Sequence, residues 1–225
     1  MLMSHRLEAD SIIKSFGGRE LLTDCWVSCD TGEILGMLGR NGCGKSTLMK
    51  IIFGTEPALN KSIRIDGKYY ETPFTAGNLI GYLPQKSFLP NNLTLRKIAD
   101  LYLPDIKAKE ALLAHRLIQQ HMHLRRHQLS GGTGRFFEIL LLVHLDVHFV
   151  LLDEPFNGLE PLLKEEVLHL LQEKKKEKGF IITDHDFRNI IQVSDRIMLI
   201  DNGVCRHIKQ IQELERFGYV PSGIF

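Results

Sequence analysis

The sequence predicts an α/β fold, with a mostly parallel sheet, an antiparallel β edge and an inserted helical subdomain. Short apolar runs at residues 33–38, 149–152 and 180–183 are typical of strands buried on both faces, and helical stretches separate them along the chain. Residues 7–30 alternate apolar and polar side chains in places, which predicts an antiparallel hairpin. Residues 93–128 contain no strand-like run, which predicts an inserted group of helices.

The N-terminal half begins with the hairpin, which is expected to turn at Phe16-Gly17-Gly18. The elements expected after it are strand 33–38, helix 45–53, two short strands within 60–70, and strand 79–83. Gly54 suits the C-terminal cap of the first helix because glycine adopts the left-handed conformation readily. Pro84 lacks a backbone N–H group, so it is expected to end the last of these strands.

The C-terminal half is predicted to alternate helices and strands. Its expected elements are helices 95–102, 109–118 and 133–144, strand 149–152, helix 161–178, strand 180–183, helix 186–192, strand 196–200 and helix 209–217. Gly179 is expected to cap a helix, and Asn202-Gly203 to form a hairpin turn. We expect one domain over residues 1–225, with the helical subdomain inserted at about residues 86–144.

Composition narrows the class of protein. The 225 residues carry a formal net charge of +1, which argues against a nucleic-acid partner, and 44% of them are hydrophobic, enough for a sizeable core. No stretch reaches the roughly 18–20 apolar residues of a membrane span, and no signal peptide is visible. We expect a cytosolic protein, with any membrane role supplied by a partner. Its four cysteines are expected to be reduced.

Residues 39–47 read Gly-Arg-Asn-Gly-Cys-Gly-Lys-Ser-Thr and match the phosphate-binding loop pattern. Backbone N–H groups of such a loop wrap a polyphosphate, a lysine approaches the β and γ phosphates, and a serine hydroxyl ligates Mg²⁺. The alternative is a chance match in a glycine turn, but a strand-like run before the loop and a helix-like run after it supply the expected context. The predicted nucleotide-binding residues here are Gly39, Arg40, Asn41, Gly42, Cys43, Gly44, Lys45, Ser46 and Thr47. The motif predicts a P-loop NTPase core.

Two carboxylates follow the apolar run at residues 149–152. Asp153 and Glu154 are expected at the C-terminal end of a central strand, where open α/β sheets bind their ligands. One carboxylate can hold Mg²⁺ and the next can orient and deprotonate an attacking water. An Asp-Glu pair after a strand is common by chance, so this assignment depends on the phosphate-binding loop. Within that loop, Cys43 is expected to have a lowered pKa, because it lies near Lys45 and a helix N-terminus.

With these two sites the chain resembles the nucleotide-binding subunits of ABC (ATP-binding cassette) transporters, over about residues 5–215. Further motifs of that family occur in the same order: Phe16-Gly17, Tyr82-Leu-Pro-Gln85, Leu129-Ser-Gly-Gly132, Asn157-Gly-Leu-Glu160 and Thr183-Asp-His185. The Leu-Ser-Gly-Gly signature is the most specific of them, because other P-loop ATPases lack it.

The resemblance implies a role for each motif. Phe16 would stack on adenine, Gln85 would sense Mg²⁺ and the attacking water, and His185 would contact the γ-phosphate. The signature residues Ser130, Gly131 and Gly132 would meet the γ-phosphate bound by a second subunit, in a head-to-tail homodimer or heterodimer that encloses two ATP. The implied catalytic residues are Lys45, Glu154 and His185, and the implied Mg²⁺ ligands are Ser46, Gln85 and Asp153.

Each of these residues also has an ordinary structural explanation. Phe16 could be a turn aromatic, Gln85 a polar loop residue and Ser130 a simple helix N-terminal cap. A cap, however, does not need two glycines after it, whereas an anion that contacts exposed N–H groups does. Two departures from the family pattern, Thr133 after the signature and Glu160 after the carboxylates, put the rate of hydrolysis in question more than ATP binding.

The function predicted from the sequence is that of an ATP-binding and ATP-hydrolysing subunit that energises transport through a separate membrane permease. The subunit is expected to be cytoplasmic and to attach through that permease to the inner face of the membrane. The alternative is a soluble ABC-type ATPase that acts in cofactor or complex assembly. A repair-type member is excluded because residues 48–128 are too few to hold its long coiled coil. A small-molecule kinase would have no use for the Leu-Ser-Gly-Gly signature.

Overall fold

The computed structural model describes residues 4–225 and contains two sheets with helices packed around them. The strands are β1 (Arg6–Phe16), β2 (Arg19–Asp30), β3 (Ile34–Gly39), β4 (Asn60–Ile65), β5 (Lys68–Tyr69), β6 (Ile80–Leu83), β7 (Phe149–Asp153), β8 (Gly179–Thr183), β9 (Arg196–Asp201) and β10 (Val204–Ile208). The α-helices are α1 (Lys45–Phe53), α2 (Leu95–Tyr102), α3 (Ile106–Leu113), α4 (Gly131–His144), α5 (Pro161–Lys174), α6 (Phe187–Val193) and α7 (Glu213–Arg216). The α/β fold class predicted from the sequence is confirmed.

The larger sheet has six strands in the order β10-β9-β3-β8-β7-β6. Every neighbouring pair in it is parallel except β9 and β10, which the turn at Asn202-Gly203 joins as an antiparallel hairpin. β8 separates β3 from β7, and Asp153 at the end of β7 is in register with Thr183 at the end of β8. The C-terminal ends of the parallel strands therefore meet at one edge of the sheet.

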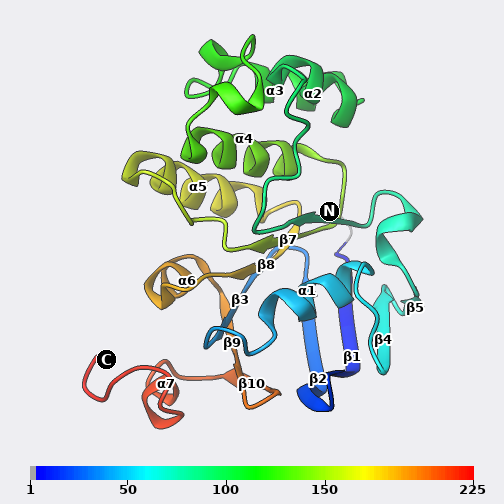
Figure 1. The fold of residues 1–225 in the computed structure, drawn as a ribbon, viewed down its shortest axis with the longest axis vertical. Coiled ribbons are helices and arrows are strands. Elements are labelled where there is room, and N and C mark those ends of the chain that lie inside the picture. Colours follow the sequence, from blue (N-terminus) through cyan, green and yellow to red (C-terminus); the bar gives the residue numbers. More distant parts are fainter. Residues whose placement is uncertain (1–3) are drawn as a thin grey trace.

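The parallel strands are buried on both faces, because their side chains alternate between two hydrophobic clusters. On β3, Ile34 and Leu38 face the cluster formed with α4, α5 and α6, whereas Leu35 and Met37 face the cluster formed with α1 and the antiparallel strands. Figure 1 shows the same division, with α4 and α5 on one side of β7 and β8, and with α1 between this sheet and β1–β2. This double burial explains the uninterrupted apolar runs in the sequence.

The smaller sheet is fully antiparallel, in the order β2-β1-β4-β5. β1 and β2 form the predicted long hairpin, with a turn at Gly17 and Gly18, which both have positive φ. β4 and β5 are the two short strands expected within residues 60–70. Apolar side chains of β1 and β2 join Leu48 and Ile52 of α1 in one buried cluster. The hairpin therefore packs beside the helix that follows the phosphate-binding loop.

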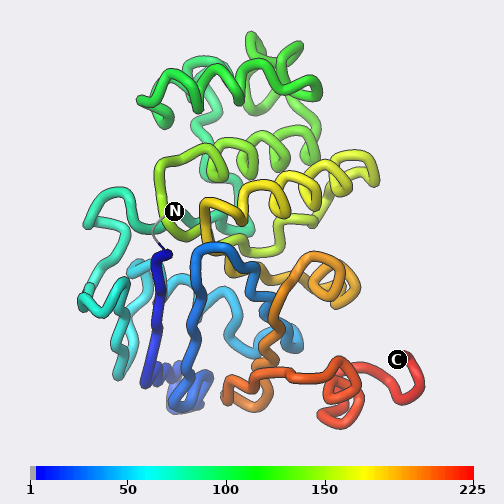
Figure 2. The backbone as a smooth tube through the Cα atoms, turned by 180° about the vertical axis from the view of Figure 1, so that it is seen from behind, coloured from blue at the N-terminus to red at the C-terminus, as the bar shows by residue number. Residues whose placement is uncertain are grey.

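The helices α2 and α3 lie beyond α4, at the end of the molecule farthest from the chain's C-terminus (Figure 2). Thr94 and Asp105 cap α2 and α3, and each side chain accepts a hydrogen bond from a backbone N–H in the first turn of its helix. Buried residues of α2 and α3, such as Ile98 and Leu112, belong to the same cluster as Phe136 of α4 and Leu152 of β7. The helical region and the parallel sheet thus share one continuous core.

Several helix bounds differ from the sequence prediction. The helix expected over 109–118 lies at Ile106–Leu113 because Asp105 caps it, and the helix expected over 209–217 is the single turn of α7. α5 ends at Lys174, and Gly179, predicted as its cap, is instead the first residue of β8. The N–H group of Gly179 donates to the carbonyl of His148, and a Cβ there would lie 2.7 Å from the carbonyl oxygen of Asp30. Close packing against another strand, and not helix capping, explains this glycine.

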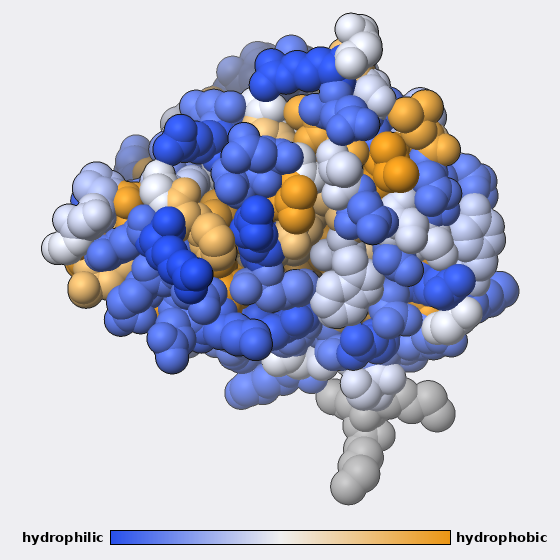
Figure 3. Space-filling model, turned by 90° about the horizontal axis from the view of Figure 1, so that it is seen from below, coloured by the Kyte–Doolittle hydropathy of each residue, from blue (hydrophilic) through white to orange (hydrophobic). Residues whose placement is uncertain are grey.

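The surface seen in Figure 3, from below the view of Figure 1, is mostly hydrophilic, with apolar residues in separate spots and no continuous apolar band. Within residues 4–225, no helix has both the length and the hydropathy that a membrane crossing requires.

Candidate functional site

The phosphate-binding loop joins β3 to α1 and is shaped by glycines. Gly42 and Gly44 have positive φ angles of 78° and 109°, which glycine adopts without the strain that a Cβ would cause. A Cβ at Gly44 would also lie 2.9 Å from Leu22 of the hairpin. Lys45 is buried, and its Nζ donates to the carbonyl oxygens of Gly39 at 2.6 Å and Arg40 at 3.3 Å. Two backbone carbonyl groups of the loop therefore hold the Lys45 ammonium in place.

The three residues predicted to hold Mg²⁺ come together. The Ser46 hydroxyl lies 3.1 Å from Oδ1 of Asp153, and Nε2 of Gln85 donates to the same hydroxyl at 3.1 Å. Asp153 is 1% exposed, whereas Gln85 follows β6 and is exposed. These side chains come from the ends of β6 and β7 and from the first turn of α1. The parallel sheet topology places them at one point.

Two further residues, neither of them predicted from the sequence, orient Asp153. The Tyr82 hydroxyl donates to Oδ2 of Asp153 at 3.1 Å, and the Thr183 hydroxyl donates to Oδ1 at 2.9 Å. Burial, with the nearby Asp153 carboxylate as a second cause, raises the pKa of Tyr82, so the phenol stays protonated and keeps donating. Thr183 could have been found, because it precedes Asp-His at the end of a strand next to β7. Tyr82 had no distinguishing sequence signal.

Glu154 has an unusual backbone conformation. Its φ angle is 51°, in the left-handed region that non-glycine residues rarely adopt. Its N–H group donates to the backbone carbonyl and to the hydroxyl of Thr183, both at 3.1 Å, and its own carbonyl accepts from the Arg135 guanidinium at 3.1 Å. Strained conformations of this kind persist when several contacts hold them, and they cluster at functional sites.

A cavity of about 360 Å³ joins the two predicted sites. Its lining residues are Leu21, Asn41, Gly42, Gly44, Lys45, Ser46, Thr47, Gln85 and Glu154. One cavity wall is therefore the phosphate-binding loop, and the other carries the second of the two carboxylates. A polyphosphate in it would contact the loop N–H groups and approach Glu154.

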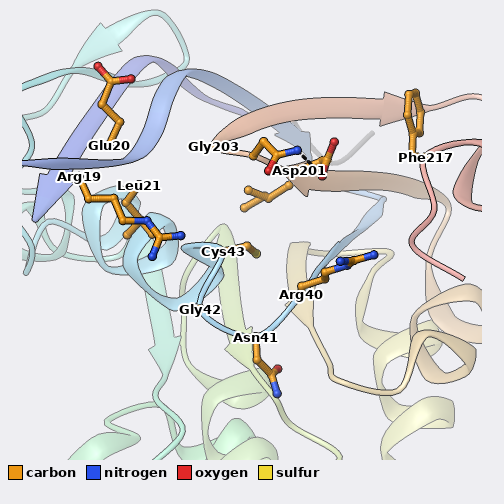
Figure 4. Close-up of a pocket in the computed structure, with 12 residues that line it drawn as sticks. Arg19, Glu20, Leu21, Arg40, Asn41, Gly42, Cys43, Asp201, Gly203 and Phe217 are labelled. Atoms are coloured by element: carbon orange, nitrogen blue, oxygen red, sulfur yellow. Dashed lines mark hydrogen bonds between the residues drawn. The ribbon is translucent and has the colours of Figure 1, made fainter.

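A second cavity of about 470 Å³ adjoins the first and shares Leu21, Asn41 and Gly42 with it. Figure 4 shows Arg19 of the hairpin and Arg40 of the loop on two sides of this cavity, with Cys43 between them. The Arg40 guanidinium donates to the carbonyl oxygen of Gly218 at 2.9 Å. The loop thereby contacts the C-terminal segment of the chain.

Phe16 and His185 lie outside both cavities. Phe16 ends β1, is 53% exposed, and has Nζ of Lys14 at 4.5 Å from its ring centre. His185 follows β8, and its side chain is 58% exposed with Nδ1 at 3.5 Å from Oδ1 of Asp184. Asp184 is buried, and burial raises the pKa of its carboxyl group. The contacts of Phe16 with adenine and of His185 with the γ-phosphate remain predictions.

The signature residues begin α4, away from both cavities. Ser130 is the helix N-cap, and its hydroxyl accepts from the N–H group of Thr133 at 3.0 Å, so the ordinary capping role is present. Gly132 also has a packing reason, because a Cβ there would lie 2.9 Å from the carbonyl oxygen of Gly158. Gly131 has no such reason: it is exposed, and an added Cβ would meet no atom within 4 Å. Gly131 is therefore the glycine that the chain's own packing leaves unexplained.

The prediction of a lowered pKa for Cys43 is wrong. Burial raises the pKa of this thiol, and the opposing effect of the nearby Lys45 ammonium is smaller. A Cβ at Gly39 would lie 2.4 Å from its sulfur, so the thiol packs against the first residue of the loop. Proximity to a cation and a helix N-terminus was read correctly from the sequence, but the burial of the thiol was not.

Comparison with known proteins gives one consistent result. The chain matches the ABC transporter family over residues 22–157. It is 30% identical to the lipopolysaccharide export system ATP-binding protein LptB of Acidithiobacillus ferridurans, over 89% of this chain and 88% of that protein. It is 31% identical to LptB of Escherichia coli strain K12, over 88% of this chain and 87% of that protein.

Solved structures agree. The structure of an ATP-binding subunit of an ABC transporter has a TM-score of 0.83 and 26% identity, over 94% of this chain and 93% of that chain. A bacterial Atm1-family ABC exporter with ATP bound has a TM-score of 0.82 at 20% identity, over 97% of this chain and 42% of that chain, which supports the fold alone.

Proposed function

This chain belongs to the ATP-binding subunits of ABC transporters, and from that premise we propose how its own residues bind and hydrolyse ATP. The family assignment establishes an ATPase that powers transport, in preference to a soluble assembly ATPase.

ATP binds across the phosphate-binding loop. The loop N–H groups and the N-terminus of α1 surround the β-phosphate, and Lys45 exchanges the carbonyl oxygens of Gly39 and Arg40 for β- and γ-phosphate oxygens. Phe16 stacks on the adenine ring of ATP. The Lys14 ammonium lies over one face of the exposed Phe16 ring, so adenine would stack on the opposite face. These assignments rest on the loop geometry and on the family motifs.

The residues at the proposed Mg²⁺ site suit that ion. Among the described residues no cluster of three His, Cys, Asp or Glu side chains forms an all-protein metal site. Mg²⁺ instead keeps several waters and binds through one or two carboxylates together with substrate phosphates. Asp153, the Ser46 hydroxyl and the Gln85 side chain supply such a set, already joined by hydrogen bonds. When bound, the ion would neutralise charge that develops between the β- and γ-phosphates.

Hydrolysis needs a base beside the γ-phosphate. Glu154 lines the same cavity as Lys45 and Ser46, so its carboxylate can orient a water and take its proton. His185 contacts the γ-phosphate after a rearrangement, because its exposed ring lies outside this cavity. Lys45 stabilises the negative charge of the transferred group. Glu154, His185 and Lys45 form the proposed catalytic set.

Two subunits enclose two ATP head to tail. Ser130, Gly131 and Gly132 lie away from the chain's own nucleotide cavities but at an exposed helix N-terminus. The N-terminus of a helix attracts anions, so these residues can complete the site of a second copy or a homologous subunit. The exposure of Gly131, with open space around its Cα, supports this placement.

The membrane partner is a permease on whose cytoplasmic face the chain sits. Two relatives are named as parts of an export system, and an ABC exporter shares the fold. We place the permease contact at residues 86–104, the segment that directly follows Gln85 in the sequence. This segment includes α2, on which Leu101 is 66% exposed. If this placement is right, Leu101→Asp reduces recovery of the chain with co-expressed permease in the membrane fraction and leaves ATP binding unchanged. Unchanged recovery would contradict it.

The convergence of Ser46, Gln85 and Asp153 beside Glu154 carries the proposal. Its test is steady-state ATP turnover of Glu154→Gln and Asp153→Asn, with Glu165→Gln on helix α5 as the control. Glu154→Gln should abolish turnover and keep ATP binding, because glutamine keeps the shape and loses the base. Asp153→Asn should lower turnover and raise the Mg²⁺ concentration needed for half-maximal turnover, because a neutral amide is a weaker Mg²⁺ ligand than a carboxylate. Near-normal turnover in Glu154→Gln would show that another group activates the water.

A further inference from the structure

We propose that Arg135 is a positioning residue for the catalytic base, and that its ion pair with Glu138 links the base to the Gln85 segment. This inference rests on the proposed function, since it takes Glu154 as the base and Gln85 as the residue that senses Mg²⁺ and the attacking water. No family motif assigned to the chain includes Arg135 or Glu138. Both residues lie inside helix α4, one to two turns after the signature.

The Arg135 guanidinium is buried and donates four hydrogen bonds through Nη1 and Nη2. Its side chain is 8% exposed, and that of Glu138 is 1% exposed. Nη2 donates to the carbonyl oxygens of Asp153 at 2.6 Å and Glu154 at 3.1 Å, while Nη1 donates to that of Pro84 at 2.6 Å and to Oε2 of Glu138 at 3.3 Å. One planar group therefore holds the backbone at the ends of β6 and β7 together.

These contacts explain how Glu154 keeps its left-handed backbone. The carbonyl groups of Asp153 and Glu154 flank the φ and ψ bonds of Glu154. Because Nη2 of Arg135 donates to both carbonyl oxygens, it restricts rotation about these two bonds. On the other side, the N–H group of Glu154 donates to the hydroxyl and the backbone carbonyl of Thr183. A non-glycine residue at positive φ costs free energy unless its surroundings over-determine it. Arg135 supplies that constraint at the residue whose carboxylate must face the attacking water.

The ion pair also reaches both sides of Gln85. Arg135 donates to the carbonyl of Pro84, which precedes Gln85, and the Glu138 carboxylate accepts a hydrogen bond from the hydroxyl of Ser87, which follows it. The same helix begins with the signature residues. A movement of α4 would thus be transmitted to the sensor loop and to the base together. A nucleotide held by the second subunit, by displacing the signature end of α4, would therefore shift the catalytic base as well.

A buried ion pair stabilises a core less effectively than apolar side chains of the same size. Removing both charges from water costs free energy, and well-packed apolar replacements often preserve or raise stability. Burial lowers the pKa of Arg135, while the Glu138 carboxylate opposes this shift. If the pair served packing alone, apolar side chains of similar size could replace it without loss of activity. That difference allows a test.

The test compares Arg135→Lys with the double variant Arg135→Met, Glu138→Met. Lysine keeps the positive charge but lacks the fork that binds three carbonyls at once. The double variant removes both charges, so it leaves no unpaired ion in the core. Arg116→Lys, at a guanidinium that is 66% exposed and paired with Glu166, is the matched control. For each protein the midpoint of thermal unfolding, the Kd of Mg-ATP and kcat are measured.

We expect kcat to fall by roughly 100-fold in both Arg135 variants, because misplacement of a catalytic group by about 1 Å costs that much. The Kd of Mg-ATP should stay within about threefold of the unmodified chain, and Arg116→Lys should change neither quantity. Unchanged kcat in either Arg135 variant would overturn the inference. So would parallel losses of ATP binding and folding in Arg135→Lys, which would indicate a structural role only. Glu154→Gln separates the two proposals. If this variant still turns over ATP, the assignment of Glu154 as the base is wrong, whatever the Arg135 variants show.

Discussion

The Asp153 carboxylate is held in one orientation by neighbouring side chains. Three neighbours from three elements contact its carboxylate: Ser46, Tyr82 and Thr183. A carboxylate held in this way needs little reorganisation when it meets a metal ion, which is how enzymes lower the cost of assembling a site. Lys45 differs, because its ammonium binds the carbonyl groups of Gly39 and Arg40 in the loop, and under the proposed function it would have to leave them to contact the phosphates.

Lys45→Ala tests this account at the residue scale. The substitution removes the cation nearest the β- and γ-phosphates and leaves the loop backbone in place, so Mg-ATP binding should weaken at least tenfold and turnover should vanish. Lys50→Ala, at an exposed lysine in the last turn of the same helix, is the control. The measurements are equilibrium titration with Mg-ATP and phosphate release. Unimpaired turnover in Lys45→Ala would refute the assignment of the loop.

The residues of the site were predictable to different degrees. The sequence motifs located Ser46, Gln85 and Asp153, because their spacing from strands and glycines is local information. Arg135 could not be found in this way, since its partners are backbone carbonyls of segments far away in the sequence. The raised pKa of Cys43 was also missed, because burial of a thiol depends on tertiary packing.

At the scale of elements, α4 connects most parts of the site. Its N-terminus carries the signature, its second and third turns carry the Arg135–Glu138 pair, and its apolar residues pack between the helical region and the parallel sheet. Element order was predictable from local patterns, but some helix ends were not. Gly179 was expected to end a helix, yet it pairs with Phe149 of β7 and is the first residue of β8.

The two signature glycines should respond differently to substitution. In Gly131→Ala the new Cβ meets nothing in this chain, and alanine favours a helix over glycine by about 1 kcal/mol, so the midpoint of thermal unfolding should hold or rise. ATP turnover should nevertheless fall at least tenfold, because the methyl group would obstruct the γ-phosphate of the second subunit. Gly132→Ala, which would contact the carbonyl of Gly158, should lower stability as well.

A stability measurement and an ATPase assay on the two alanine variants separate these effects. If Gly131→Ala retains full turnover at high protein concentration, then the signature N-terminus does not approach a nucleotide closely, and the proposed dimer geometry is wrong.

His144 at the end of α4 should make stability depend on pH. Burial lowers the pKa of His144, and the hydrogen bond between Nδ1 and the Leu140 carbonyl, at 2.7 Å, opposes this shift only in part. The unfolded chain then binds more protons than the folded chain at acidic pH, so stability should be complete above the ordinary histidine pKa of about 6.5 and fall as pH drops below it. His144→Gln should flatten this dependence in thermal unfolding between about pH 5 and 7.5.

The exposed His123 provides the control for this effect. His123→Gln should leave the pH dependence of thermal unfolding unchanged. Equal slopes for the unmodified chain and His144→Gln would assign the acid sensitivity to other groups.

At the scale of the whole molecule, the fold was largely predictable because its parallel strands are buried on both faces and therefore leave uninterrupted apolar runs. The sharing of one core between the helical region and the sheet was not predictable, since it depends on contacts between α4 and β7. This shared core bears on function. Under the proposed function, a force applied to α2 and α3 by a permease would act on a core that is continuous with β7, the strand that carries Asp153.

The central claim is that two copies of this chain, or this chain and a homologue, enclose ATP between the loop of one and the signature of the other. The mass of the Glu154→Gln chain in solution, measured by gel filtration with light scattering, tests it most directly. The variant should be monomeric without nucleotide and dimeric with Mg-ATP, with Gly131→Ala added to the same chain preventing the shift. A monomer at saturating Mg-ATP, or a dimer that forms equally well without nucleotide, would contradict the claim.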